Sequence, residues 1–285
     1  MAPESSTFVS VGLGLASAVS WGAGDFSGGL ASRRAGALSV VVASQGVGLV
    51  LLVALAAATG EAVPSAGRLA WAALAGASGA VGLLALYSAL ASGRMGIAAP
   101  VAGVVGAVVP VLAGAAVDGP PGALRLTGFG LALAGVWLLA APERGVGGAG
   151  PRELALPVLA GVSFGLFLVL IHRAGGPAVL WPLVTARAAS LGLLAVVGGV
   201  VGALGLPRGR STLGLTVLAG VLDTGGNAFF VLATLAGRLD VAGVLSSLYP
   251  ASTVALACVL LRERFTPRQT AGAAATLGAI ACISL

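Results

Sequence analysis

The chain contains two copies of one sequence pattern. Residues 74–96 (LAGASGAVGLLALYSALASGRMG) align without a gap to residues 218–240 (LAGVLDTGGNAFFVLATLAGRLD), and both stretches contain Gly-Arg close to their ends. Five long apolar segments lie before residue 145 and five lie after it. Because five is odd, the second copy must enter a membrane in the opposite orientation to the first. Inverted repeats of this kind are typical of secondary transporters, which bind their substrates at the interface between the repeats.

The composition supports a membrane location. Hydrophobic residues make up 58% of the chain and charged residues 8%, and the mean hydropathy is +1.07; a soluble domain carries about a quarter charged residues. A helix needs about 20 apolar residues to cross a bilayer, and ten segments meet that length within a few residues. They cover residues 8–31, 37–58, 68–91, 96–117, 124–141, 154–172, 178–204, 213–235, 240–261 and 267–285.

These patterns predict the fold class. We expect an all-α polytopic membrane protein of ten transmembrane helices, arranged as two inverted-topology five-helix repeats around a central cavity. The repeats would occupy residues 1–145 and 146–285, joined by a Gly-rich linker at 142–153. An even number of spans places both termini on one side of the membrane. Most loop arginines fall on the opposite side, so the positive-inside rule, taken literally, places both termini outside the cell.

Several classes of function lack the residues that they need. Cys258 and Cys282 lie within apolar spans, with no Cys/His spacing for a metal, and His172 is the only histidine. No nucleophile elbow, zinc-protease helix or phosphate-binding loop is present. The fifteen basic residues are all arginine, and all except Arg187 stand singly or in pairs at or between the ends of the apolar segments. We therefore expect no enzyme activity, no cofactor, no metal and no nucleic-acid partner.

A few charged residues lie inside the predicted spans, where charge is costly and usually faces a cavity or a partner. Asp25 follows Trp21 by four residues, so the ring and the carboxylate share one helix face. Asp223 and Asn227 also stand four apart. Arg187 lies well inside its span, where it would neutralise a carboxylate or contact a substrate carboxylate. The alternative for each residue is a structural pair or interhelical hydrogen bond.

Uncharged residues complete the predicted binding site. Gln45 lies in the region of the first repeat that corresponds to Arg187, and Tyr87 and Tyr249 are aromatic residues at mid-span. Pro110 and Pro250 occupy equivalent places in the two repeats once a gap of four residues is allowed. Because proline removes a helix hydrogen bond, we expect kinks at both prolines. Paired kinks indicate either the binding site or a packing feature.

The end of the chain resembles EamA-type transporters of the drug/metabolite transporter superfamily. The run SSLYPASTVALACVLLRERFTPRQTAGAAATLGAI carries the resemblance, supported by Trp21-Gly22 and Arg187. The first half matches less well, because Asp118-Gly-Pro-Pro replaces the usual Glu-Arg turn. The matching positions in the final run are Ser-Leu-Tyr-Pro at 247–250, Thr253, Glu263-Arg264, Gln269 and Gly272.

The resemblance implies ten helices around a cavity in a bacterial inner membrane, both termini cytoplasmic, and alternating access by rocking of the halves. It also implies export of amino acids or related amphipathic compounds by a monomer or weak homodimer. The candidate substrate-binding residues are Trp21, Asp25, Gln45, Tyr87, Arg187, Asp223, Asn227 and Tyr249. Asp25 and Asp223 are the candidate proton carriers. The alternatives are a sugar or nucleotide-sugar carrier and, from another class, an intramembrane enzyme or a scaffold.

Overall fold

The computed structural model describes residues 4–91, 95–140, 151–201, 205–253, 256 and 267–284, and every element within these ranges is an α-helix. The boundary expected between the repeats, at residue 145, lies outside the described residues. The first half below means residues up to 140, and the second half means residues from 151 onward. The helices are α1 (Glu4–Ala35), α2 (Ala37–Thr59), α3 (Ala66–Ala91), α4 (Met95–Asp118), α5 (Ala123–Ala140), α6 (Pro151–Ala174), α7 (Leu180–Val201), α8 (Arg210–Ala236), α9 (Leu239–Ser246) and α11 (Pro267–Ser284).

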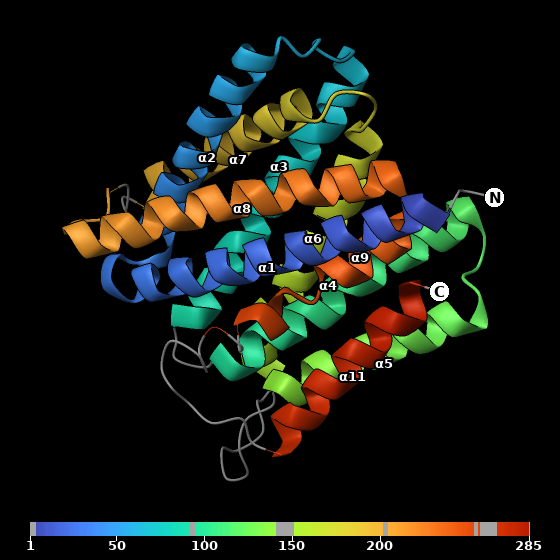
Figure 1. Cartoon of the computed structure of the whole chain (residues 1–285). Helices are drawn as coiled ribbons and strands as arrows, with labels where there is room; N and C mark the ends of the chain where they lie inside the picture. Colours follow the sequence, from blue (N-terminus) through green and yellow to red (C-terminus); the bar gives the residue numbers. More distant parts are fainter. Residues whose placement is uncertain are drawn as a thin grey trace.

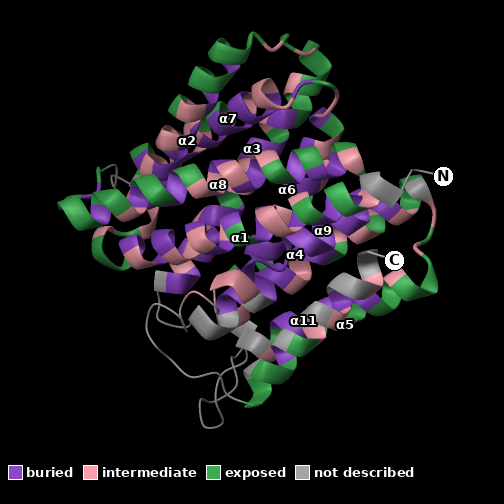
Figure 2. Ribbon diagram, viewed as in Figure 1, coloured by how far each residue is buried: buried purple, intermediate pink, exposed green. Residues whose placement is uncertain are grey.

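Six of the described helices, α1, α2, α3, α6, α7 and α8, are long and apolar enough to cross a bilayer. Shorter apolar stretches occupy Val101–Val117 in α4 and Ala123–Leu138 in α5. Large apolar side chains such as Val50, Leu112 and Val200 are exposed, and buried positions follow the inner faces of the helices (Figure 2). The chain is therefore a multi-pass membrane protein, as expected, while the count of ten spans and the inverted orientation stay predictions.

The two matched prolines affect their helices differently. α9 ends at Ser246, residues 247–248 form a turn, and helical structure resumes at Tyr249. Pro250 explains this interruption, because its ring would clash with the carbonyl of Ser246 in a continuous helix. The expected span at 240–261 is thus interrupted where Pro250 predicts. α4 runs without interruption through Pro110. The two matched prolines, at which we expected kinks, therefore do not interrupt their helices in the same way.

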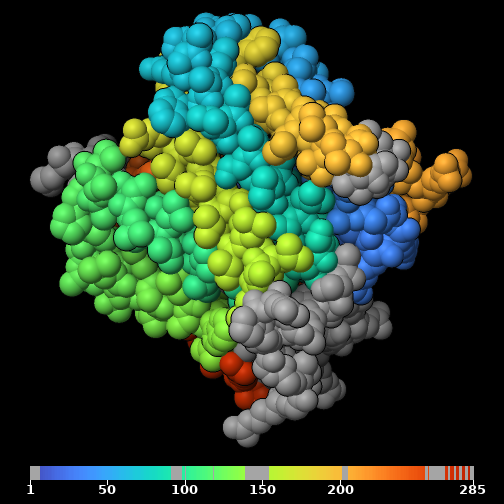
Figure 3. Space-filling model, turned by 180° about the vertical axis from the view of Figure 1, so that it is seen from behind, coloured from blue at the N-terminus to red at the C-terminus, as the bar shows by residue number. Residues whose placement is uncertain are grey.

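Helices of the first half pack mainly against helices of the second half. α1 lies along α8 (Figure 1), and α3 lies along α6, which Figure 3 shows from behind. α2 contacts α7 and α8, α4 contacts α6 and α9, and α5 pairs with α11 at the edge of the molecule. When α1–α5 are exchanged with α6–α9 and α11, the α1–α8 contact maps onto α3–α6, α2–α8 onto α3–α7 and α4–α6 onto α1–α9, while the α2–α7, α4–α9 and α5–α11 contacts map onto themselves. The packing is what a two-fold relation between the halves would produce.

Serine hydroxyls join α1 to α8. Ser10, Ser17 and Ser20 donate hydrogen bonds to the carbonyl oxygens of Ala233, Gly226 and Leu222, at 2.9, 2.8 and 2.9 Å. The partner numbers fall as the serine numbers rise, so the two helices are antiparallel. Interhelical hydrogen bonds of this kind are worth about 0.6 kcal/mol each in a membrane. We call these three contacts the serine ladder.

Small residues let backbones approach at matching places in the two halves. A Cβ atom at Gly76 of α3 would overlap the Ala186 backbone of α7, and one at Gly220 of α8 would overlap the Ser44 carbonyl of α2. The matched prolines pack reciprocally as well. The Pro110 ring lies over Gly243 of α9, and the Pro250 ring lies over Gly103 of α4. Close approach through glycine is a common way to pack membrane helices.

A loop of the first half caps a helix of the second half. The Glu61 carboxylate, between α2 and α3, accepts hydrogen bonds from the backbone N–H groups of Val179, Leu180 and Trp181 at 2.7 to 3.1 Å. The Trp181 indole Nε1–H donates to the Glu61 carbonyl oxygen at 2.8 Å. The N-terminal N–H groups of a helix lack partners within the helix and attract negative charge. The corresponding helix of the first half, α2, has no side-chain cap at Gly36.

Candidate functional site

A cavity with an empty volume of about 760 Å³ lies between the two halves. α1, α2, α3 and α4 line it from the first half, and α6, α7, α8 and the turn after α9 line it from the second. Ligand sites in helical proteins often lie between helices, so the cavity is a candidate ligand site by its position.

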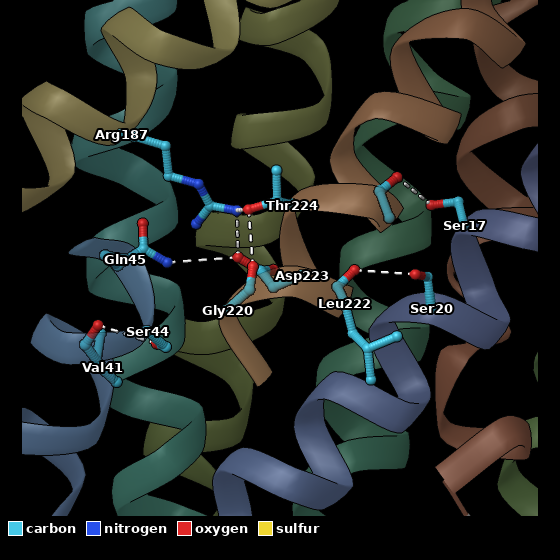
Figure 4. A network of polar contacts seen from close by, with 11 residues as sticks. Ser17, Ser20, Val41, Ser44, Gln45, Arg187, Gly220, Leu222, Asp223 and Thr224 are labelled. Atoms are coloured by element: carbon cyan, nitrogen blue, oxygen red, sulfur yellow. Dashed lines mark hydrogen bonds and ion pairs between the residues drawn. The ribbon is translucent and has the colours of Figure 1, made fainter. Parts of the chain in front are cut away.

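An ion pair crosses the cavity wall between α7 and α8. Arg187 Nη2 lies 2.5 Å from Asp223 Oδ2, and the two side chains are 7% and 18% exposed. Arg187 Nη2 also donates to Thr224 Oγ1 at 3.4 Å, and Gln45 Nε2 donates to Asp223 Oδ2 at 3.4 Å. Figure 4 shows Arg187 and Gln45 pointing at Asp223 from different helices. Each charge of this pair is therefore already compensated within the protein.

Asp25 is the third charged residue in the lining, and its environment differs. Its side chain is half-buried and faces the same cavity. Within the described ranges, no hydrogen bond or ion pair reaches its carboxylate. Trp21, one turn earlier on α1, also lines the cavity and stacks on Phe230 with ring centres 6.1 Å apart. The residues thus place an uncompensated carboxylate beside an indole ring.

Two hydroxyl groups in the lining are buried without a hydrogen-bond partner among the described residues. They are Ser190 Oγ on α7 and Tyr249 Oη after the α9 turn. A buried polar group without a partner costs about 1–3 kcal/mol. Both hydroxyls therefore have hydrogen-bonding capacity that no described residue uses.

The cavity has two chemically different walls. Trp21, Asp25, Asp223 and Asn227 come from the packed pair α1 and α8, and we call them the polar wall. The other wall comes from the packed pair α3 and α6. This apolar wall consists of Gly79, Leu83, Phe164, Phe167 and Leu168.

The two walls occupy corresponding positions of the two halves. Leu168 stands where Asp25 stands in the other half, and Gly79 and Leu83 stand where Asp223 and Asn227 do. Leu83 is 8% exposed and Leu168 is 3% exposed, whereas Asp25 is half-buried. At positions that the sequence pattern matches, one wall is therefore polar and the other apolar.

Seven of the eight substrate-binding residues expected from the sequence line this one cavity, and Tyr87 is the exception. The Tyr87 ring is 2% exposed and packs against Gly28 of α1, where a Cβ atom would overlap it. Whether these residues bind substrate stays a prediction. Ser190 and Ser247 were not expected, because an isolated serine in an apolar helix carries no distinguishing signal.

Other residues singled out in the sequence lie outside the site or outside the described residues. Glu263, Arg264 and Cys258 belong to the second group. Among the described residues, no cluster of His, Cys, Asp or Glu is arranged to hold a metal ion. His172 lies in the last turn of α6, as expected from its position beside Arg173.

The helices and the cavity define a multi-pass α-helical membrane protein with a site between two halves. Residues 9–141 match the EamA-like transporter family, which belongs to the drug/metabolite transporter superfamily. This match confirms the predicted resemblance, and it falls on the half whose motifs fit less well. A transporter family also accords with the expectation that the chain is not an enzyme.

Two further comparisons complete this result. A solved structure described as "Crystal structure of protein" is 19% identical in sequence, with a TM-score of 0.75 over 97% of this chain and 98% of that one. At that identity the likeness concerns the fold, over nearly the full length of both chains. No curated protein matches.

Proposed function

We propose that the chain is a secondary transporter that exports amino acids or related small amphipathic compounds across a bacterial inner membrane by alternating access. The observation that carries this proposal is the cavity between the halves, with its polar wall on α1 and α8 and its apolar wall on α3 and α6. A compound with a polar head and an apolar body fits these two walls in one orientation.

In this proposal the walls have separate roles. Phe164, Phe167 and Leu168 contact the apolar part of the substrate, and Trp21 lies on the opposite wall beside Asp25. Asn227 and Tyr249 offer hydrogen bonds to its polar head. Asp25 and Asp223 are the candidate proton carriers, since a carboxylate inside a membrane can exchange a proton with an aqueous cavity. No cofactor takes part, and the working unit is a monomer or a weak homodimer.

A counterflow assay tests the proposal. The purified protein is reconstituted into liposomes preloaded with unlabelled amino acids, amines, sugars or nucleosides, and uptake of the labelled compound is followed. We expect uptake of at least one amphipathic amine or amino acid well above empty liposomes. Absence of uptake for every compound would refute the transport function.

Coupling to protons is tested in the same liposomes with an imposed pH gradient. We expect the gradient to change the initial rate for the wild type and to have no effect on the Asp25→Asn/Asp223→Asn double variant. An undiminished response in that variant would remove both aspartates as proton carriers. Gln45→Leu serves as a control that alters the same polar contacts without removing a carboxylate.

A further inference from the structure

We infer that the cavity selects compounds with a cationic amine and no carboxylate, and that Asp25 and Trp21 hold the amine. This inference rests on the proposed transport function and narrows its substrate class. The evidence is the balance of charge in the cavity. Of the charged lining residues, Arg187 and Asp223 neutralise each other, while Asp25 has no partner among the described residues.

The first step concerns the charge that a ligand must carry. The described part of the lining holds two carboxylates and one guanidinium, so its formal charge is −1 when all three groups are ionised. An uncompensated charge away from water is costly, and a cation in the cavity relieves that cost. An anionic ligand would add a second uncompensated charge next to Asp25. The cavity therefore favours a monovalent cation.

The second step concerns the aromatic ring. Trp21 precedes Asp25 by one helical turn, and both residues line the cavity. Phe230 of α8 stacks on Trp21, and a Cβ atom at Gly226 would overlap the indole, so α8 fixes the position of the ring. Indole is the best aromatic partner for an ammonium group, and the gain is larger when water is excluded. A carboxylate and an indole together are suited to an organic ammonium group.

The third step concerns the carboxylate of an amino acid. Among the described residues of the lining, Arg187 is the only basic one, and it already contacts Asp223 and Thr224. A substrate carboxylate would have to displace Asp223 and leave it without its partner. The earlier expectation that Arg187 contacts a substrate carboxylate is thus disfavoured by its surroundings. An amine with an apolar body satisfies Asp25 and the apolar wall without disturbing the ion pair.

Three compounds that share a phenylethyl group test this inference. Phenylalanine carries an amine and a carboxylate, 2-phenylethylamine lacks the carboxylate, and 3-phenylpropionate lacks the amine. Binding to the purified full-length protein in detergent is measured by isothermal titration calorimetry. We expect 2-phenylethylamine to bind at least ten-fold more tightly than phenylalanine, and 3-phenylpropionate to show no binding. Tighter binding of either carboxylate compound would overturn the inference.

Variants then assign the amine to its residues. We expect Asp25→Asn to weaken 2-phenylethylamine binding at least ten-fold and Trp21→Leu to weaken it about five-fold. Trp137→Leu is the matched control, because Trp137 is 49% exposed on α5, which does not line the cavity. An unchanged Kd in a folded Asp25→Asn protein would overturn the assignment. If the Asp25→Asn protein does not fold, the comparison of Trp21→Leu with Trp137→Leu tests the assignment. Equal effects of these two substitutions on the Kd for 2-phenylethylamine would overturn it.

Failure of the cation site and failure of the transport function give different results in these experiments. If amines bind through Asp25 but no compound crosses the liposome membrane, the cation site stands and the transport function is refuted. If phenylalanine is transported and 2-phenylethylamine neither binds nor moves, the transport function stands and the cation site is refuted.

Discussion

Replacing Glu61 by glutamine is expected to destabilise the protein, although the residue lies in a loop and not in the cavity. The carboxylate accepts from three consecutive backbone N–H groups at the start of α7. Glutamine retains one acceptor oxygen and loses the negative charge. A charge at a helix N-terminus contributes up to about 2 kcal/mol when partly buried, and each hydrogen bond contributes about 1 kcal/mol. The expected loss for Glu61→Gln is about 2 kcal/mol, and for Glu61→Ala about 3 kcal/mol.

Thermal unfolding in a mild detergent measures this effect, with Glu61→Asp as the matched variant. Aspartate keeps the charge and shortens the side chain, so its melting temperature is expected to lie between those of the wild type and of Glu61→Gln. Trp181→Phe removes only the indole donor to the Glu61 carbonyl and is expected to lower the melting temperature least. A Glu61→Gln protein that melts with the wild type would refute the argument. So would a Glu61→Asp protein that melts below Glu61→Gln.

Two further substitutions probe the packing and the ion pair. Gly76→Ala is expected to lower the free energy of unfolding by about 1–3 kcal/mol, because the new methyl group would overlap the Ala186 backbone. Gly67→Ala is the matched control, since a methyl group at this position of the same helix meets open space. Equal melting temperatures of the two variants would contradict the reasoning. Arg187→Met is expected to cost about 3–5 kcal/mol by leaving Asp223 without its cation. The Arg187→Met/Asp223→Asn double variant should recover part of that loss, and a double variant less stable than Arg187→Met would contradict this account.

Most of the helix positions follow directly from the sequence. Eight apolar segments become α1 to α8 with ends shifted by a few residues, because hydrophobic length sets the extent of a membrane helix. The ninth segment was expected to be continuous apart from a kink. The structure ends α9 at Ser246 and resumes the helix at Tyr249, which Pro250 accounts for. The same residue type at Pro110 leaves α4 uninterrupted, so a proline alone did not determine the local structure.

The candidate site was partly predictable for a physical reason. Charges such as Asp25 and Arg187 are conspicuous in an apolar helix because they are costly there. Their partners are not visible in sequence, since the pairing of Arg187 with Asp223 depends on how α7 and α8 pack. Glu61 was missed because one acidic residue in a loop resembles any solvated charge. Its role depends on the position of α7 in space.

The serine ladder has a mechanical consequence. It joins α1 of the first half to α8 of the second half. If the two halves moved as rigid bodies, one against the other, these three hydrogen bonds would have to break. A movement that separates the α1 and α8 layer from the α3 and α6 layer leaves these bonds intact. The moving parts of such a cycle are then not the two sequence halves. Each part contains one helix from either half, so the chain passes from one moving part to the other more than once.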